Sequence, residues 1–276
     1  MSEKSVVSVI VPTKNSEKTL QRCLKSIRQQ SYPYVEVIVV DNYSTDATKA
    51  IAEEFADLFL LKGPERSAQV NFGAIYASGK YVYRVDSDFI VEPTVIEEAI
   101  FECEKKGHDA ICVHNASDST VSFWSKVRKL ERDCYDGDDL NVAVRFIRKT
   151  VFLQVNGFDE KLIAAEDYDL HNKILNQGYK IGDIKAKELH LGEPKTLSEI
   201  VTKHYYYGKN IRVFLKSNQK RGKKQVSPIR PALFINWRKF FDQPLLALGF
   251  FVYQSVRYFS AFLGYLASQN FENSEN

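Results

Sequence analysis

Tyr81-Val-Tyr-Arg-Val-Asp-Ser-Asp88 is a mostly apolar run that ends in two carboxylates one residue apart. If the run is a β-strand, Asp86 and Asp88 project to the same side, because side chains alternate along an extended backbone. Two acids held in this way suit a hard divalent cation, which takes oxygen ligands and can bridge to phosphate. An isolated Asp-x-Asp is usually a solvated loop, however, so its meaning depends on the rest of the chain.

The segments before this run alternate between strand-like and helix-like patterns. Three apolar runs precede Tyr81, and an amphipathic stretch follows each of them. This order predicts an α/β fold with a mostly parallel, Rossmann-like sheet and helices on both faces. The predicted strands are 6–11, 35–40, 58–61 and 81–85, and the predicted helices begin near residues 17, 47 and 67.

Polar or strand-ending residues come directly after three of these strands. Pro12 ends the first strand, Asp41 follows the second and Asp86 follows the fourth. In open α/β sheets, ligands bind beyond the carboxyl ends of the strands. We therefore expect these positions to converge on one crevice, which favours a functional role for Asp86 and Asp88.

Length and composition limit the possible classes of protein. With 276 residues, 44% of them hydrophobic, the chain can form one large core or a core with an appendage. A net charge of +3 is too small to indicate a nucleic-acid partner. The four cysteines have neither paired nor metal-like spacing, and from the polar N-terminus we expect no signal peptide. We therefore expect the catalytic part to face the cytoplasm.

The second half of the chain is less regular. Helices are expected at 94–106, 121–134 and 166–176, with a strand at 110–113 and an acidic turn at 136–139. Thr196-Leu-Ser-Glu199 has the spacing of a capping box, which predicts a further helix to about residue 216. We accordingly place the end of the catalytic domain at residue 217, so that this domain comprises 1–217.

The region from 218 to 276 changes character. Five cations and no acid lie from Lys216 to Lys224, which suits a solvated loop or an anionic lipid surface. Aromatic residues near Trp237 interleave with basic ones, as in a helix lying in a membrane interface. Residues 245–267 are long and apolar enough to cross a bilayer, although Arg257 would cost about 2.5–3.5 kcal/mol there. We interpret 218–276 as a basic loop plus an interfacial or transmembrane helical region; a core helix or a homodimer contact is the alternative.

Five short motifs occur in a fixed order: Val9-Ile-Val-Pro-Thr-Lys-Asn15, Val39-Val-Asp-Asn-Tyr-Ser-Thr-Asp46, Asp86-Ser-Asp88, Asn156-Gly-Phe-Asp-Glu160 and Glu166-Asp167. Together they resemble the family 2 glycosyltransferases, over roughly residues 6–215. The resemblance implies a GT-A nucleotide-sugar-binding fold and inversion of the anomeric centre. The C-terminal region is similar to the membrane-anchoring regions of members that glycosylate polyprenyl lipids.

The resemblance gives the ends of the first two strands a role in binding the donor nucleotide. Pro12, Thr13 and Asn15 would contact the base or ribose, and Asp41 would accept a hydrogen bond from a uracil or guanine N–H. The structural alternatives are strand termination at Pro12 and Thr13, and an Asx-turn or a cap at Asp41.

The resemblance also assigns the diphosphate and metal end of the donor site. Arg66 and Asn71 lie at and just after a predicted helix start, which favours anions, although Arg66 also fits a simple surface arginine. Asp86 would touch ribose or sugar hydroxyls. Asp88 would bind the divalent metal, Mn²⁺ or Mg²⁺, that neutralises the leaving nucleoside diphosphate. His190 is a further candidate near the metal, although a lone histidine is more often structural.

Asp167 is the predicted general base. Inversion requires an acceptor hydroxyl to attack the anomeric carbon from the face opposite the leaving phosphate, and a carboxylate must take up its proton. Asp167 matches the second acid of the family's Glu-Asp pair, and Glu166 would orient it or bind the acceptor. The alternative is that both are first-turn acids favoured by the helix dipole.

No Gln-x-x-Arg-Trp processivity motif follows the Glu166-Asp167 pair, so we expect a single transfer rather than polymer synthesis. The expected protein is a metal-dependent inverting glycosyltransferase at the cytoplasmic face of a cell membrane. It would move one sugar from a nucleotide-sugar donor, GDP-mannose or a UDP-sugar, to a polyprenyl- or dolichyl-linked acceptor. A soluble dimeric transferase acting on a protein or polysaccharide is one alternative, and an inactive glycosyltransferase-like scaffold is another.

Overall fold

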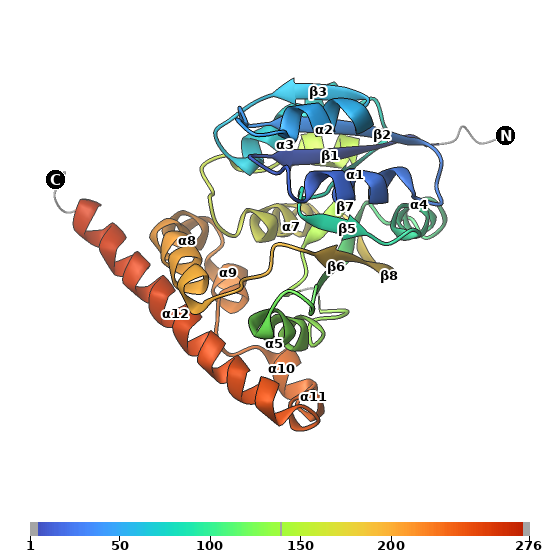
Figure 1. Cartoon of the computed structure of the whole chain (residues 1–276). Helices are drawn as coiled ribbons and strands as arrows, with labels where there is room; N and C mark the ends of the chain where they lie inside the picture. The colour runs from blue at the N-terminus through green and yellow to red at the C-terminus, as the bar shows by residue number, and fades with distance from the viewer. Residues whose placement is uncertain (1–4, 139, 273–276) are drawn as a thin grey trace.

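The strands predicted in the N-terminal half form the parallel part of the sheet. In the computed structural model, which describes residues 5–138 and 140–272, β1 (Val7–Thr13) pairs in parallel with β2 (Val35–Asp41) and β4 (Tyr81–Arg84) (Figure 1). β2 in turn pairs in parallel with β3 (Leu58–Leu61). The register sets Thr13 opposite Asp41, so the carboxyl ends of β1 and β2 are level.

The other half of the sheet is mixed. β7 (Val144–Arg148) is antiparallel to β4 and to β6 (Ala110–Ser117), whereas β8 (Ile181–His190) is parallel to β6 and antiparallel to β5 (Phe89–Val91). The strand order is β3-β2-β1-β4-β7-β6-β8-β5. The α/β class is confirmed, but the expected parallel arrangement applies to the N-terminal half. β5 and β7 were not predicted, because β5 has three residues and Arg145 interrupts the apolar pattern of β7.

Helices cover both faces of the sheet, as expected. Successive residues of β1 point to opposite layers, with Val9 in one buried cluster and Ile10 in the other. The helices on the Val9 face are α1 (Leu20–Arg28), α2 (Thr48–Phe55) and α4 (Val95–Lys105), and those on the Ile10 face are α3 (Arg66–Tyr76), α6 (Lys149–Gln154) and α7 (Glu166–Asn176).

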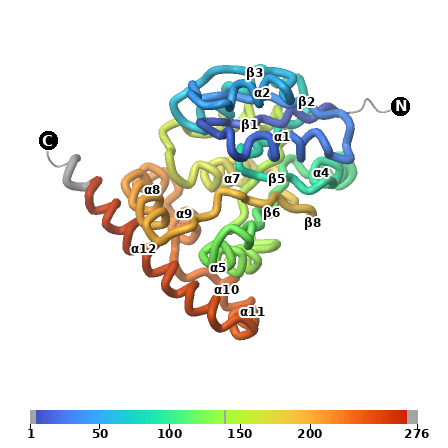
Figure 2. The backbone as a smooth tube through the Cα atoms, viewed as in Figure 1, coloured from blue at the N-terminus to red at the C-terminus, as the bar shows by residue number. Residues whose placement is uncertain are grey.

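The remaining helices pack together beside the sheet, and the long C-terminal helix runs along their outer side (Figures 1 and 2). The predicted capping residue Thr196 accepts a hydrogen bond from the Glu199 N–H at 3.3 Å and begins a helix that ends at Ser217. These helices are α5 (Phe123–Arg132), α8 (Leu197–Ser217), α9 (Gln219–Gln225), α10 (Pro231–Ile235), α11 (Arg238–Phe241) and α12 (Pro244–Glu272).

α12 is packed tightly against α8. A Cβ atom at Gly208 would come within 2.0 Å of the Ala261 carbonyl oxygen, and one at Gly264 within 2.1 Å of the Tyr205 carbonyl oxygen. Only glycine allows the two backbones to approach this closely. The C-terminal helix is therefore fixed to the part of the chain that carries the site residues.

One side of α12 faces the protein and the other carries apolar side chains that nothing in the structure covers. Arg257 points inward and pairs with the buried Glu131 of α5 at 3.2 Å, which compensates its charge. Pro244–Ser268 is long and apolar enough to cross a membrane, with a mean hydropathy of 1.2. Of its most apolar 18-residue stretch, 22% is buried. We call the uncovered side of α10–α12 the outer apolar face. Its residues are Phe234, Ile235, Trp237, Phe241, Leu245, Leu248, Phe251, Phe259 and Leu266.

Candidate active site

The carboxyl ends of β1 and β2 are joined by a network around Asp41. Its Oδ1 accepts a hydrogen bond from Thr13 Oγ1 at 2.9 Å, and its Oδ2 accepts one from the Ser44 N–H at 2.7 Å. Asp41 is buried, and its bond to the Ser44 N–H, three residues on, holds the turn after β2. A nucleotide base would therefore have to share this carboxylate with the turn.

The loops after β1 and β2 hold each other in place. The Asn15 N–H donates to Ser44 Oγ at 2.7 Å, and Asn15 Oδ1 accepts from the Thr45 N–H at 2.9 Å. Asn15 and Tyr43 have φ angles of 47° and 52°, in the left-handed region that few non-glycine residues adopt. Pro12 lies within β1 opposite Val40. These strained loops form one wall of the crevice beyond the parallel strands.

The Asp86–Asp88 turn adjoins this wall, as Ser87 Oγ lies 2.9 Å from Ser16 Oγ. Asp86 itself is surrounded by guanidinium groups: Arg84 Nη2 at 3.0 Å, Arg145 Nη2 at 3.3 Å and Arg66 Nη1 at 3.7 Å. Burial opposes ionisation of Asp86, but the three arginines outweigh it and hold its pKa well below the usual range. Asp86 is therefore a permanent anion in a cationic environment.

The two acids at the start of α7 complete the same cluster. Arg84 Nη1 forms an ion pair with Asp167, and Arg66 Nη2 forms one with Glu166. Burial raises the pKa of Glu166, and the nearby Asp167 charge adds to this while Arg66 and Arg84 oppose it. Ala165, which precedes both acids, has a φ of 63°, a strained conformation that turns the chain into the first turn of α7.

Asp88 and His190 come together from β-strand ends that are distant in the sequence. His190 Nε2 lies 3.1 Å from Asp88 Oδ2, and its Nδ1 lies 2.9 Å from Glu193 Oε1. Glu193 also pairs with Arg132 at 3.0 Å. Within residues 5–138 and 140–272, no three His, Cys, Asp or Glu side chains form a complete metal cage. Asp88 and His190 nevertheless fit a cation that takes its other ligands from substrate phosphates, as Mg²⁺ commonly does.

Asn71 is not brought into this cluster. Its Nδ2 donates to the Phe158 carbonyl at 2.9 Å and lies 3.0 Å from Glu160 Oε1, while its Oδ1 accepts from the Phe158 N–H at 2.9 Å. The amide is fully engaged in holding the segment that precedes α7. In the structure Asn71 thus holds the Phe158 segment, and its expected donor contact stays a prediction.

Several buried charged residues at the site were missed by sequence reasoning. Arg84 and Arg145 are each 4% exposed, and Arg145 also contacts the fully buried Glu188 at 3.1 Å. Glu193 is 5% exposed and carries the His190 contact. The available signal was an arginine at a position where the strand pattern calls for an apolar residue, since buried arginines are rare unless paired.

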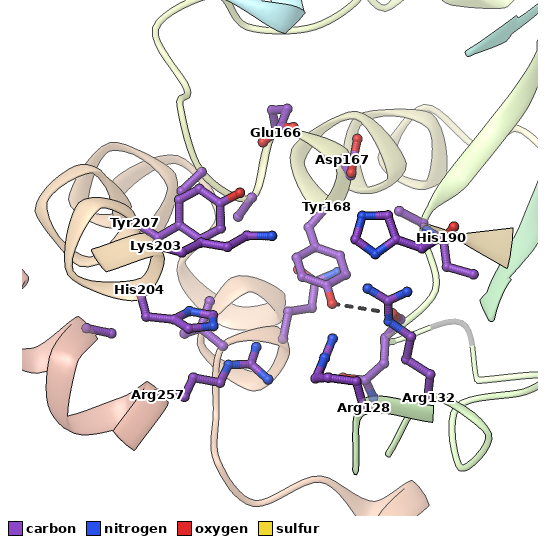
Figure 3. Close-up of a pocket in the computed structure, with 18 of the residues that line it drawn as sticks. Arg128, Arg132, Glu166, Asp167, Tyr168, His190, Lys203, His204, Tyr207 and Arg257 are labelled. Carbon is purple, nitrogen blue, oxygen red and sulfur yellow. Dashed lines mark hydrogen bonds between the residues drawn. The ribbon is translucent and has the colours of Figure 1, made fainter. Parts of the chain in front are cut away.

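A cavity of about 750 Å³ connects these residues to the C-terminal helices. Figure 3 shows Glu166, Asp167 and His190 on one side of it and Arg257 and Arg128 on the other. The lining also includes Tyr253, Tyr258, Ala261, Phe262 and Tyr265 of α12. α12 therefore helps to form the site and is not a separate appendage.

Residues 8–161 match the profile of the glycosyl transferase family 2 domain, which is more than half of the chain. The chain belongs to glycosyltransferase family 2. The match ends before Glu166, so the α7 acids, His190 and α12 lie outside it. The positions of these residues at the site of this glycosyltransferase are therefore given by the structure and not by the profile match.

Curated relatives of this glycosyltransferase share part of its length. It is 33% identical to the glycosyltransferase GlyG of Streptococcus pneumoniae over 138 residues, which is 45% of this chain and 44% of the relative. It is 25% identical to the glycosyltransferase AglE of Haloferax volcanii over 191 residues, which is 63% of each. The chain thus spans less than two thirds of these relatives.

Solved structures share the fold over nearly the whole glycosyltransferase. The mannosyltransferase PcManGT of Pyrobaculum calidifontis, solved with GDP-Man and Mn²⁺, has a TM-score of 0.66 at 16% identity and covers 96% of this chain and 88% of its own. Residues 1–349 of Staphylococcus aureus TarS, solved with UDP-GlcNAc, have a TM-score of 0.56 at 19% identity and cover 91% and 90%. At these identities, the likeness establishes the GT-A fold alone.

Proposed function

We propose that this family 2 glycosyltransferase is a metal-dependent inverting enzyme that transfers one sugar from a nucleoside-diphosphate sugar to a lipid-linked acceptor at the cytoplasmic face of a membrane. The observation that carries the proposal is the meeting of Asp86, Asp88, Glu166, Asp167 and His190 at the carboxyl edge of the sheet, on a cavity that α12 helps to line. Intact acids in this arrangement argue against an inactive scaffold.

The donor would lie along the carboxyl ends of β1, β2 and β4. Its base and ribose would contact the Thr13–Asp41 pair and the adjoining loops, and Asp86 would accept hydrogen bonds from sugar or ribose hydroxyls. Arg66, at the N-terminus of α3 and 40% exposed, can turn from Glu166 to the diphosphate. Neighbouring structures that contain GDP-Man and UDP-GlcNAc leave both nucleotides open for this chain.

Asp88 and His190 would hold the divalent metal, Mn²⁺ or Mg²⁺. When bound, such an ion stabilises the negative charge that develops on the leaving diphosphate. The Glu193 contact fixes the imidazole ring so that Nε2 faces Asp88. The protein itself would thus supply an oxygen and a nitrogen ligand in one orientation.

Asp167 would take up the proton of the acceptor hydroxyl. In the structure its carboxylate pairs with Arg84, which keeps the side chain beside Asp86 and therefore beside the donor sugar. Its 30% exposure opens it to the cavity from which an acceptor would approach. Attack by that hydroxyl on the face opposite the diphosphate inverts the anomeric centre.

The acceptor assignment rests on α12. Ala261, Phe262 and Tyr265 line the cavity, and the outer apolar face extends along the same helix. A lipid-linked acceptor could therefore keep its chain in the membrane while its polar end reaches Asp167. The Arg257–Glu131 pair and the close α8 contact favour a helix that lies on the membrane over one that spans it.

Thermal-shift screening of the full chain against UDP- and GDP-sugars, with and without Mn²⁺, tests the donor and the metal together. A specific donor should raise the melting temperature, and Mn²⁺ should increase that shift, because a ligand that binds the folded state stabilises it by mass action. No stabilisation by any nucleotide sugar under either condition would refute the proposed activity.

A polymer acceptor is the second candidate function. The chain is 33% identical over 117 residues to TarS, a poly(ribitol-phosphate) β-N-acetylglucosaminyltransferase. Extraction decides between the two: a protein that leaves disrupted cells in buffer without detergent supports the polymer acceptor, whereas retention in the membrane fraction supports the lipid-linked one.

A further inference from the structure

Five cations line the cavity. Arg128 and Arg132 come from α5, Lys203 from α8, Arg257 from α12, and Arg230 lies just before α10. Figure 3 shows that the labelled cations among them converge on the same space. We call these five residues the cationic cluster.

Carboxylates compensate this cluster only in part. Glu131 pairs with Arg128 and lies 3.2 Å from Arg257 Nη1, so one carboxylate balances two arginines. It also accepts a hydrogen bond from Tyr135 at 2.8 Å. Glu193 pairs with Arg132 and is also held by His190. Five cations thus face two carboxylates, an excess of three positive charges.

Arg230 and Lys203 have no carboxylate partner in the part of the chain that the structure describes. Arg230 is 5% exposed; its guanidinium lies 5.1 Å from the centre of the Tyr135 ring and donates to the Ser227 and Gln225 carbonyls at 3.3 and 3.4 Å. Lys203 lies 5.9 Å from the centre of the Tyr207 ring. Glu131 acts on the Arg230 charge only from beyond ion-pair distance, and a buried guanidinium without a directly paired carboxylate is costly to the fold unless a ligand supplies the charge.

The charges also affect one another. Burial and the Arg128 charge lower the pKa of Arg132 to about 10. Burial at its ammonium end, followed by the charges of Arg132 and Arg128, lowers the pKa of Lys203 although the residue as a whole is exposed. Burial is the largest cause of both shifts, and the neighbouring cations add to it.

We propose that the cationic cluster binds a phosphate group of the acceptor, away from the hydroxyl that receives the sugar. A phosphate brings up to two negative charges and several acceptor oxygens, which match the unused N–H groups of arginine forks. The apolar Phe262 and Ala261 beside the cluster accommodate a lipid carrier, but the phosphate contact itself would serve a soluble carrier equally. This inference rests on the proposed function, since it names the chemical class of its acceptor.

Binding, measured apart from transfer, tests the inference. Isothermal titration of the full chain with inorganic phosphate, at constant ionic strength set by chloride, should show saturable binding. Arg230→Gln and Arg257→Gln should each raise the phosphate Kd by about tenfold, the equivalent of one lost charge-assisted hydrogen bond. Arg257→Lys should restore part of the affinity. Arg238→Gln, which removes an exposed charge of α11 outside the cavity, should leave the Kd unchanged.

Two further titrations separate the possible outcomes. Farnesyl phosphate that binds more tightly than both farnesol and glycerol 3-phosphate assigns the phosphate to a lipid carrier, whereas equal affinity for the two phosphates assigns it to a soluble one. UDP and GDP should bind the cluster variants as they bind the wild type. If the variants lose nucleotide and phosphate binding together, the cluster is part of the donor site and the inference is overturned. If folded variants bind phosphate as the wild type does, the inference is overturned as well. Failure of the proposed transfer reaction would leave the phosphate titrations unchanged.

Discussion

Arg84 of β4 forms an ion pair with Asp167 of α7 and contacts Asp86 at 3.0 Å with its other terminal nitrogen. One guanidinium group thus joins the predicted donor side of the site to the predicted base. Because Arg84 is 4% exposed, its removal would leave two neighbouring carboxylates with less compensating charge.

Arg84→Met should therefore lower the free energy of unfolding by about 3 kcal/mol, the low end of the range for a broken buried pair, since Asp167 is partly exposed. Urea denaturation provides the measurement. Arg28→Met, which breaks an exposed pair with Asp57, should cost about 1 kcal/mol or less. Equal losses in the two variants would show that the Arg84 pairs contribute no more than a surface contact.

Asp167→Asn tests the assignment of the base. The amide keeps the size of the side chain but cannot accept the proton, so kcat should fall by about 10²–10⁴-fold while the donor Kd is unchanged. Asp169 is the matched control: it is also a first-turn acid of α7, but it pairs with Lys173 at 2.9 Å and accepts from Asn218 at 2.7 Å. If Asp169→Asn lowers kcat as much as Asp167→Asn does, both acids act through the helix and the base lies elsewhere.

The sequence was sufficient to predict the parallel half of the sheet and the acids at its edge, because buried β-branched runs and their terminal polar residues depend on local pattern. It was insufficient for Arg84 and Arg145. Asp86 follows Arg84 by two residues, but the other partners, Asp167 and Glu188, lie on elements far away in the sequence, and no local pattern predicts such a partnership. Asn71 shows another limit, since its place just after a helix start suggested a donor contact, whereas its amide is bonded to Phe158 in the structure.

Asp88 and His190 are predicted to bind the metal, so their loss should remove the effect of metal on donor binding. In the wild type, Mn²⁺ should tighten the binding of UDP or GDP in isothermal titration. Asp88→Asn should reduce that gain by about tenfold or more, because a neutral amide replaces a charged ligand. Asp183→Asn, on the exposed face of the strand that ends at His190, should retain the full gain. A wild-type metal response in Asp88→Asn would contradict the ligand role.

His204 makes stability depend on pH. Burial, followed by the charges of Arg257, Arg128 and Lys203, lowers its pKa from 6.5 to about 2 in the folded state. Below pH 6.5 the unfolded chain binds a proton that the folded chain does not, so the free energy of unfolding falls by up to about 1.4 kcal/mol per pH unit from this group. Urea denaturation at pH 7, 6 and 5 should show a shallower decline for His204→Gln than for the wild type. Parallel declines would mean that His204 is protonated in the folded protein.

The outer apolar face is predicted to hold the enzyme on a membrane. Trp237 and Phe241 are 50% and 75% exposed at the end of this face, so Trp237→Ser combined with Phe241→Ser should weaken binding to vesicles containing anionic lipid by about tenfold or more. Flotation with such vesicles measures it. Phe101→Ser, which removes a 53% exposed aromatic residue from α4, is the matched control and should bind as the wild type does. If the double variant binds vesicles normally but changes from dimer to monomer in analytical ultracentrifugation, the face is a contact between two copies of the chain, and the case for a lipid-linked acceptor loses its structural support.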